Sequence, residues 1–165
     1  MRHDDDLQLS IRAFVMNHRI DYTKASPVGF AAFLGVHAAI YKASLAKDLI
    51  NLVYLRVSQI NGCAFCIDMH TRDLLKADMP MEKLALVPVW HDAGKLFTQR
   101  ERAALAWAES VTRVADTHVP DADYTAATAE FSEQELADLT YAIGLMNAFN
   151  RFGVAFRSPP AAAKA

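Results

Sequence analysis

Apolar side chains recur at helical spacing along almost the whole chain, and this periodicity is the strongest constraint on its fold. Two capping boxes add fixed helix starts, because Thr98 is followed three residues later by Glu101 and Ser132 by Glu135. The spacing predicts helices over 7–18, from Ser26-Pro27 to about Tyr41, over 46–60, 63–77 and 81–87, from Thr98 onward, over 122–130, and from Ser132 to about Phe156.

The segment 46–60 decides between an all-helical and a mixed fold. It is apolar on nearly every side, as expected for a helix buried between neighbours. A buried strand is the alternative, because residues 52–57 are compact and partly β-branched. We favour the helix, since the apolar run exceeds ten residues and no other segment offers a partner strand. The sequence therefore predicts an all-α fold.

Nothing in the sequence divides the chain into parts. It has no internal repeat, low-complexity segment or internal linker, so we expect a single helical-bundle domain over residues 1–165. Residues 88–97 are expected to be irregular, and residues 158–165 to form a mobile tail. With 165 residues, 53% of them hydrophobic, the chain is long enough to bury a full core.

Charge and hydropathy exclude several classes of protein. The 17 Lys and Arg residues against 19 Asp and Glu give a net charge of −2, so the chain has no basic excess for a nucleic-acid partner. Residues 1–6 are acidic where a signal peptide is basic. The most apolar stretch, 28–41, is shorter than the about 20 residues that span a bilayer. We expect a cytoplasmic protein without a membrane partner.

Two cysteines and a histidine form the most informative pattern. Cys63, Cys66 and His70 are three and four residues apart, so they project from one face of the helix predicted over 63–77, which Asn61 can cap. In the first turn of a helix, free backbone N–H groups stabilise a thiolate, and an imidazole one turn later can accept a proton. In a reducing compartment, such a pair is typical of a dithiol/disulfide redox couple.

Other interpretations of the pattern are weaker. Cysteines can be small hydrophobic core residues. Cys63, Cys66 and His70 also supply three zinc ligands, but a structural zinc site needs four and the chain has no second Cys-x-x-Cys or His-x-x-x-His. A thioredoxin-type fold is disfavoured because no βαβ pattern surrounds the cysteines. We therefore expect neither a metal nor another cofactor.

Three segments resemble the alkylhydroperoxidase D-like (AhpD-like) family within the carboxymuconolactone decarboxylase superfamily. They are the run 52–70 with its Cys-x-x-Cys-x-x-x-His centre, the run 97–107, and residues 147–151, and the likeness covers about residues 20–157. The resemblance implies an all-helical fold that assembles into homo-oligomers, either trimers or hexamers. It also implies a thiol-dependent peroxidase that an external dithiol, such as a lipoylated protein, reduces again.

The same resemblance implies that Cys66 is the peroxidatic thiol, Cys63 the resolving thiol and His70 the proton-relay group. One position departs from the family, whose hydroperoxidases have a glutamate twelve residues before the first cysteine, where this chain has Asn51. An amide cannot take up a proton near neutral pH, so the relay is incomplete here. Asp48, one turn earlier, could act as a substitute, although an ordinary helix-start acid is the favoured interpretation.

The remaining polar candidates are expected to be structural. They are His37 in an apolar helix, Trp90-His91 in the irregular stretch, Ser58 and Gln59, and the amide-rich group Asn147, Asn150 and Arg151, which we expect to tie helices together.

The sequence thus predicts an enzyme that reduces organic hydroperoxides or hydrogen peroxide through a cysteine pair. A lactone decarboxylase of the same superfamily is one alternative, although that chemistry needs no second cysteine. A redox-sensing or interaction protein without turnover is another, which the amide at Asn51 favours.

Overall fold

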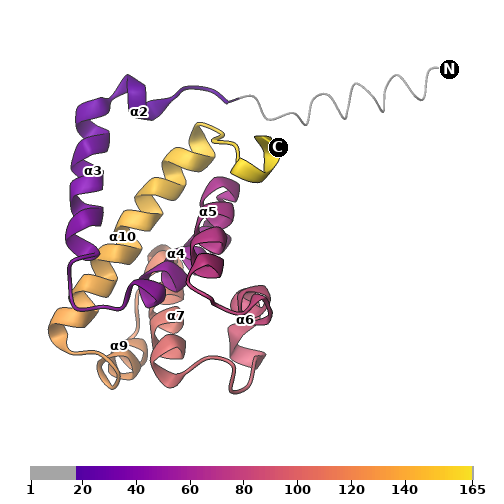
Figure 1. Cartoon of the computed structure of the whole chain (residues 1–165). Coiled ribbons are helices and arrows are strands. Elements are labelled where there is room, and N and C mark those ends of the chain that lie inside the picture. Colours follow the sequence, from indigo (N-terminus) through magenta and orange to yellow (C-terminus); the bar gives the residue numbers. More distant parts are fainter. Residues whose placement is uncertain (1–17, 165) are drawn as a thin grey trace.

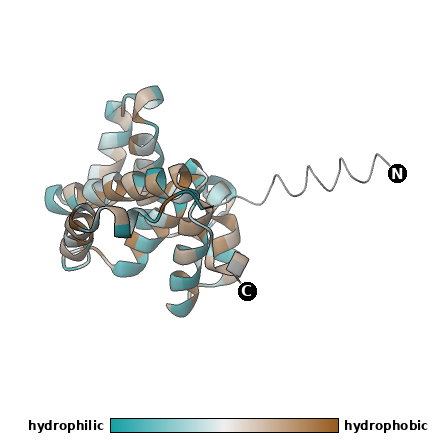
Figure 2. Cartoon of the chain, turned by 90° about the horizontal axis from the view of Figure 1, so that it is seen from above, coloured by the Kyte–Doolittle hydropathy of each residue, from teal (hydrophilic) through white to brown (hydrophobic). Residues whose placement is uncertain are grey.

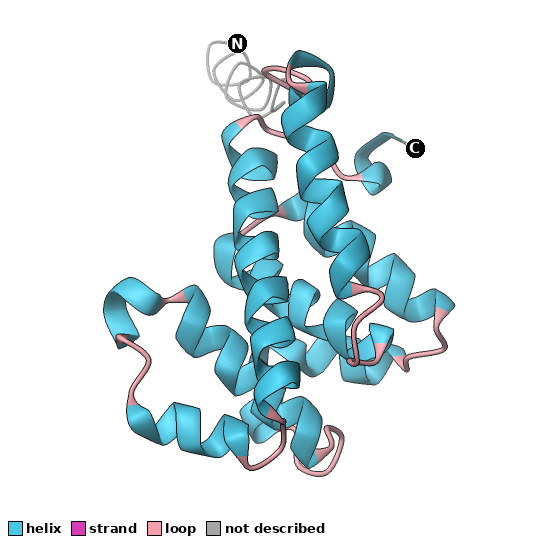
Figure 3. Ribbon diagram, turned by 90° about the vertical axis from the view of Figure 1, so that its left-hand side faces the viewer, coloured by secondary structure: helices cyan, strands magenta, loops and turns pink. Residues whose placement is uncertain are grey.

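Helices make up the regular structure of residues 18–164, the range that the computed structural model describes (Figures 1 and 3). No strand occurs in that range, so the all-α prediction is confirmed. The helix expected over 7–18 lies, apart from His18, outside the described residues. The elements are α2 (Tyr22–Ala25), α3 (Pro27–Ile40), α4 (Lys47–Asn61), α5 (Ala64–Lys76), α6 (Met81–Leu86), η1 (Val87–Asp92), α7 (Gln99–Thr112), α8 (Val114–Thr117), α9 (Asp121–Thr128), α10 (Glu133–Ala155) and η2 (Ala161–Lys164).

Helix α4 lies at the centre of the bundle, where α5, α7 and α10 pack around it. Ile50, Leu52, Val53, Tyr54 and Val57 are all completely buried. Burying one large apolar side chain contributes about 1.5–3 kcal/mol, so this helix anchors the core. The prediction that segment 46–60 forms a buried helix rather than a strand is confirmed. Figure 2 shows apolar and polar residues alternating along the helices.

One buried ion pair crosses this core. The Arg56 Nε donates to Glu109 Oε1 over 2.7 Å, and the Trp90 indole donates to the same oxygen over 2.8 Å. A charge buried in a core needs such a partner to offset the loss of water. The cluster ties α4, α7 and η1 together.

Both capping boxes form as the sequence predicts. The Thr98 hydroxyl accepts a hydrogen bond from the Glu101 backbone N–H, and the Glu101 carboxylate accepts one from the Thr98 N–H. Ser132 and Glu135 make the same pair of bonds at the start of α10. These local signals therefore fix the starts of α7 and α10, the two helices that pack against α4.

Three stretches differ from the prediction or add to it. Residues 88–97 were expected to be irregular, but η1 covers 87–92, because Pro88 has a φ suited to the first turn of a helix. Helix α2 was not predicted, and the Asp21 carboxylate caps it by accepting from two backbone N–H groups. In the segment expected to be a mobile tail, η2 lies beside α5, where the Ala162 N–H donates to the Asp68 carboxylate.

Helix α3 is attached to the bundle mainly through aromatic contacts with α10. The Phe33 ring lies 5.7 Å from that of Phe149 and 5.4 Å from that of Phe152, centroid to centroid. Only Ile40 of this helix is buried. Figure 1 shows α3 at the side of the bundle, beside α10. Residues of α3 line one part of a cavity whose remaining wall comes mainly from α5 and α10.

Candidate functional site

The cysteine pair lies where α4 ends and α5 begins. Gly62 has a φ of 67°, in the left-handed region that glycine adopts without strain, and it ends α4. The prediction that Asn61 caps α5 is wrong, because Asn61 is the last residue of α4 and the chain reverses at Gly62. Cys63 is the N-cap instead, and its Sγ accepts a hydrogen bond from the Cys66 N–H over 3.4 Å.

The two sulfur atoms are paired as a disulfide in a buried position. The Cα atoms of Cys63 and Cys66 are 5.4 Å apart, and the side chains are 1% and 3% exposed. Gly153 of α10 lies directly against them, since a Cβ at that position would be 2.7 Å from the Cys63 Sγ. The predicted dithiol/disulfide pair is thus brought together at the start of a helix, with Cys63 enclosed by α10.

His70 lies one turn after Cys66 and is also buried. Its Nδ1 is 3.2 Å from the Oδ1 of Asn51, the residue at the position where the family resemblance implies a glutamate. Burial lowers the pKa of His70 to about 4, so the imidazole is neutral at pH 7. Its Nε2 has no hydrogen-bond partner among the described residues. Asp48, the alternative relay acid, is exposed in the first turn of α4.

An apolar cavity of about 300 Å³ opens onto Cys66 and His70. Cys63 is not part of its wall, so only one of the two sulfurs is reached from this side. Because the wall is largely aromatic and aliphatic, the cavity suits an uncharged organic ligand. Its lining consists of Tyr22, Thr23, Phe30, Leu34, His37, Phe65, Cys66, Met69, His70, Met146 and Phe149.

His37 is a cavity residue that the sequence analysis expected to be structural. Its ring stacks on Tyr41 with centroids 4.3 Å apart, and burial lowers its pKa below the ordinary value for histidine. The signal available in the sequence was its place on an apolar helix, which is equally typical of a core histidine. Its position in the cavity follows from the packing of α3 against α10, which leaves a space beside α5 and which no local pattern encodes.

The other polar candidates lie outside the cavity. Asn61 donates to the side-chain oxygens of both Asn147 and Asn150, and Asn150 donates to Ser58 Oγ. This network joins α4 to α10, as expected for residues that tie helices together. His91 stacks on Trp90 at the other end of the bundle, away from the cysteines.

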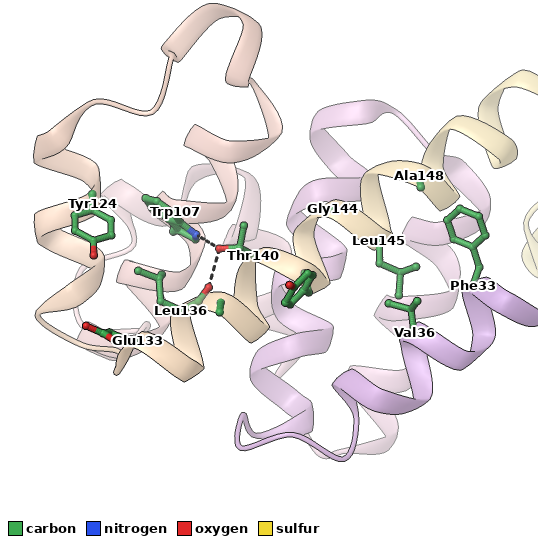
Figure 4. A pocket seen from close by; sticks show the side chains of 12 residues that line it. Phe33, Val36, Trp107, Tyr124, Glu133, Leu136, Thr140, Gly144, Leu145 and Ala148 are labelled. Carbon is green, nitrogen blue, oxygen red and sulfur yellow. Dashed lines mark hydrogen bonds between the residues drawn. The ribbon is translucent and has the colours of Figure 1, made fainter.

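A second, larger hollow of about 720 Å³ lies along α10 (Figure 4). Figure 4 shows Phe33 and Val36 of α3 at one end and Trp107 with Tyr124 at the other, with the Trp107 indole bonded to Thr140. Its wall contains neither a sulfur nor an imidazole. Of these two cavities, the smaller one therefore contains the cysteine and histidine side chains.

Residues 18–164 contain neither a metal-binding cluster nor a membrane-spanning helix. No group of three or more His, Cys, Asp or Glu side chains there is arranged to hold a metal ion. No helix within the same residues is long and apolar enough to cross a membrane.

Comparison with known proteins places this site in a family. Residues 27–110 match the carboxymuconolactone decarboxylase family. The uncharacterized protein YdfG of Bacillus subtilis is 31% identical over 140 residues, which cover 85% of this chain and 95% of YdfG. A protein of unknown function from Agrobacterium tumefaciens, ATU0492, described as a candidate antioxidant defence protein AhpD, has a TM-score of 0.84 and 38% identity over 87% of this chain and 98% of its own.

The fold also occurs in a debrominase. The debrominase Bmp8 has a TM-score of 0.73 at 19% identity, covering 86% of this chain and 75% of its own. At that identity the likeness concerns the fold alone, so the chemistry of this chain has to be argued from its own site.

Proposed function

The chain belongs to the carboxymuconolactone decarboxylase family, and on this premise we propose that it is a dithiol peroxidase acting through Cys66 and Cys63. The observation that supports the proposal best is the cavity of about 300 Å³, whose wall contains Cys66 and His70 while Cys63 is paired behind it. A substrate in that cavity would meet one sulfur and one neutral imidazole.

The cycle needs only these three side chains and an external dithiol. In the reduced protein, the Cys66 thiol transfers its proton to His70 and attacks the terminal peroxide oxygen, so that the O–O bond breaks. The alkoxide takes the proton back from His70 and leaves as an alcohol, and Cys66 becomes a sulfenic acid. The Cys63 thiol then displaces water and forms the disulfide. An external dithiol reduces the disulfide and is itself oxidised to a disulfide.

The cavity also indicates which peroxides would bind and which sulfur atom of the disulfide the reductant would attack. Its apolar wall favours an organic hydroperoxide over hydrogen peroxide, since binding then buries apolar surface on both sides. The reductant has to enter by the same route, so it attacks the Cys66 sulfur and Cys63 is the leaving thiolate. The Cys66 N–H, which already points at the Cys63 Sγ, would stabilise that thiolate.

Turnover of tert-butyl hydroperoxide with dihydrolipoamide tests the proposal. With dihydrolipoamide, the wild type is expected to consume peroxide catalytically and Cys66→Ser to be inactive. Without any added thiol, Cys63→Ser is expected to consume one equivalent of peroxide and stop as the Cys66 sulfenic acid. With a labelled thiol, Cys63→Ser should also form a mixed disulfide at Cys66. A protein that forms its disulfide but never turns over would be a redox sensor. Lactone decarboxylation that persists when both cysteines are serine would identify a decarboxylase.

A brominated aromatic ring is a second substrate class for the same pair. Four aromatic side chains line the cavity, which gives a flat ring surfaces to stack on: Tyr22, Phe30, Phe65 and Phe149. Reductive removal of bromine would oxidise the dithiol to the disulfide, replace bromine by hydrogen and release bromide. Bromide release from a bromophenol by the reduced protein, without peroxide consumption, would favour this reaction over the first.

A further inference from the structure

We infer that Tyr41 and Asn51 are positioning residues that fix His70 as the tautomer with its proton on Nδ1, leaving Nε2 as the atom that acts on the substrate. The inference rests on the proposed peroxidase for its catalytic meaning, whereas the tautomer itself exists without any reaction. It concerns the position where the family resemblance implies a glutamate and this chain has an amide. The Tyr41–Asn51 pair takes the place of that glutamate.

A single oxygen atom carries the argument. The Asn51 Oδ1 lies 2.8 Å from the Tyr41 hydroxyl, which donates to it, and 3.2 Å from the Nδ1 of His70. A carbonyl oxygen has two acceptor sites and no proton to give. Both partners must then be donors, which places the imidazole proton on Nδ1. Because Tyr41 and His70 bind the same oxygen, the hydroxyl also restrains the rotation of the amide.

The surroundings of His70 keep the ring neutral. The titratable groups around it are Tyr54 of α4, His37 of α3 and Asp73 of its own helix. Tyr41 binds the same Asn51 oxygen, and Tyr22 of α2 lines the same cavity. Helix α10 contributes only apolar side chains to the cavity, and the disulfide does not titrate. Burial outweighs the carboxylate of Asp73, so the pKa of His70 falls. A neutral ring with its proton on Nδ1 has a bare Nε2, the buried nitrogen without a partner among the described residues.

This arrangement changes the path of the proton. A carboxylate at position 51 would stabilise the imidazolium and could carry a proton away from the ring. The Asn51 amide carries no charge to stabilise the imidazolium as strongly, and it cannot take up a proton. The proton that His70 takes from the Cys66 thiol is then held at Nε2 and returned from Nε2 to the departing alkoxide. His70 acts as base and as acid through one atom, without a relay behind it.

The ¹⁵N NMR spectrum of the oxidised protein, labelled at histidine, tests the inference directly. The His70 signals, assigned by their loss in His70→Gln, are expected to show a protonated Nδ1 and a bare Nε2 at pH 7. Asn51→Leu removes the acceptor and is expected to shift the population toward Nε2–H. Asn51→Asp keeps the acceptor, so it should keep Nδ1–H while raising the pKa of the ring, which a ¹⁵N titration measures.

Turnover in matched variants adds a second readout. Asn51→Leu is expected to lower kcat/KM for tert-butyl hydroperoxide by about 10–100-fold, as loss of a supporting hydrogen bond does at other sites. Tyr41→Phe loses one neutral hydrogen bond and is expected to lose about fivefold. Tyr54→Phe is the control, because its hydroxyl lies beside the same ring, is buried and has no partner among the described residues. It should change neither the tautomer nor kcat/KM.

Two results would overturn the inference: an Nε2–H tautomer in the wild type, or equal losses in Tyr41→Phe and Tyr54→Phe. Failure of the proposed function is distinct. An Nδ1–H tautomer that depends on Asn51, in a protein that never consumes peroxide, would support the positioning role while refuting the peroxidase.

Discussion

Adding one methyl group at Gly153 should disturb the disulfide more than any other part of the protein. A Cβ there would be 2.7 Å from the Cys63 Sγ, whereas ordinary contact begins at 3.4 Å, so the sulfur or α10 has to move by about 0.7 Å. The sulfur is bonded to Cys66 and buried, so it cannot swing aside as a flexible side-chain end would. Overpacking of this kind costs about 1–3 kcal/mol.

The alanine also stabilises the helix itself, which offsets part of the cost of the overpacking. Replacing a glycine inside a helix by alanine contributes about 0.5–1 kcal/mol, so Gly153→Ala should lose about 1–2 kcal/mol of stability in total. Gly144→Ala is the matched control on the same helix, because a Cβ there meets nothing within 4 Å. It should gain about 0.5–1 kcal/mol. Urea unfolding of the oxidised proteins, followed by circular dichroism, measures both.

If both alanine variants become more stable by a similar amount, α10 does not approach Cys63 as closely as the structure indicates. A loss in Gly153→Ala that disappears when the disulfide is reduced would instead locate the strain in the bonded sulfurs, as expected. The same variant should slow closure of the disulfide after peroxide addition, because the resolving sulfur is the atom displaced.

Three further outcomes follow from the geometry. The pKa of His70 in the folded protein, about 4, lies below the ordinary value for histidine. The free energy of unfolding should therefore be highest above about pH 6.5 and fall by up to about 3 kcal/mol toward pH 4. Urea unfolding should show a smaller loss in His70→Gln. Glu109→Ala leaves a buried guanidinium unpaired and should cost about 3–5 kcal/mol in thermal or urea unfolding, whereas Lys76→Ala, which breaks an exposed ion pair, should change stability by less than about 0.5 kcal/mol. Leu34→Trp should fill the cavity and lower kcat/KM for tert-butyl hydroperoxide about tenfold while sparing hydrogen peroxide, and Val36→Trp, on the same helix but facing the other hollow, should not.

The parts of the fold that the sequence predicts are those set by local physics. The boxes at Thr98 and Ser132 act over three residues, and the apolar surface of 46–60 requires burial in any compact fold. The spacing of Cys63, Cys66 and His70 needs only the helical repeat. None of these features depends on how distant segments pack, so they are readable before the fold is known.

The error at Asn61 shows where local signals compete. Asparagine is a good N-cap, but Gly62 can take a positive φ, and ending α4 at the glycine satisfies backbone groups of the last turn of that helix. Asn61 then remains helical, and its amide joins Asn147 and Asn150 of α10. Its true role depends on a contact more than eighty residues away, which no neighbouring residue announces.

The cavity and the partner of Asn51 could not be predicted for the same reason. The cavity exists because α3 packs against α10 and leaves a space over α5, so its wall combines residues from 22 to 149. The Tyr41 hydroxyl reaches Asn51 only because the chain turns back between α3 and α4. The sequence indicated that the relay position lacked a carboxylate, whereas only the packing shows which side chain binds the amide in its place.

The electrostatics of this cavity restricts what can enter it at every step of the proposed cycle. In the oxidised state, its walls are apolar, the imidazole of His70 is neutral, and position 51 carries an amide. When the Cys66 thiolate forms, its charge is balanced by the proton held on His70, so the pair adds no net charge. An unpaired charge on a substrate or a reductant would find no partner there, and burying one costs several kcal/mol. We therefore expect the site to discriminate against charged thiols and charged peroxides alike, so that both halves of the proposed cycle favour uncharged molecules.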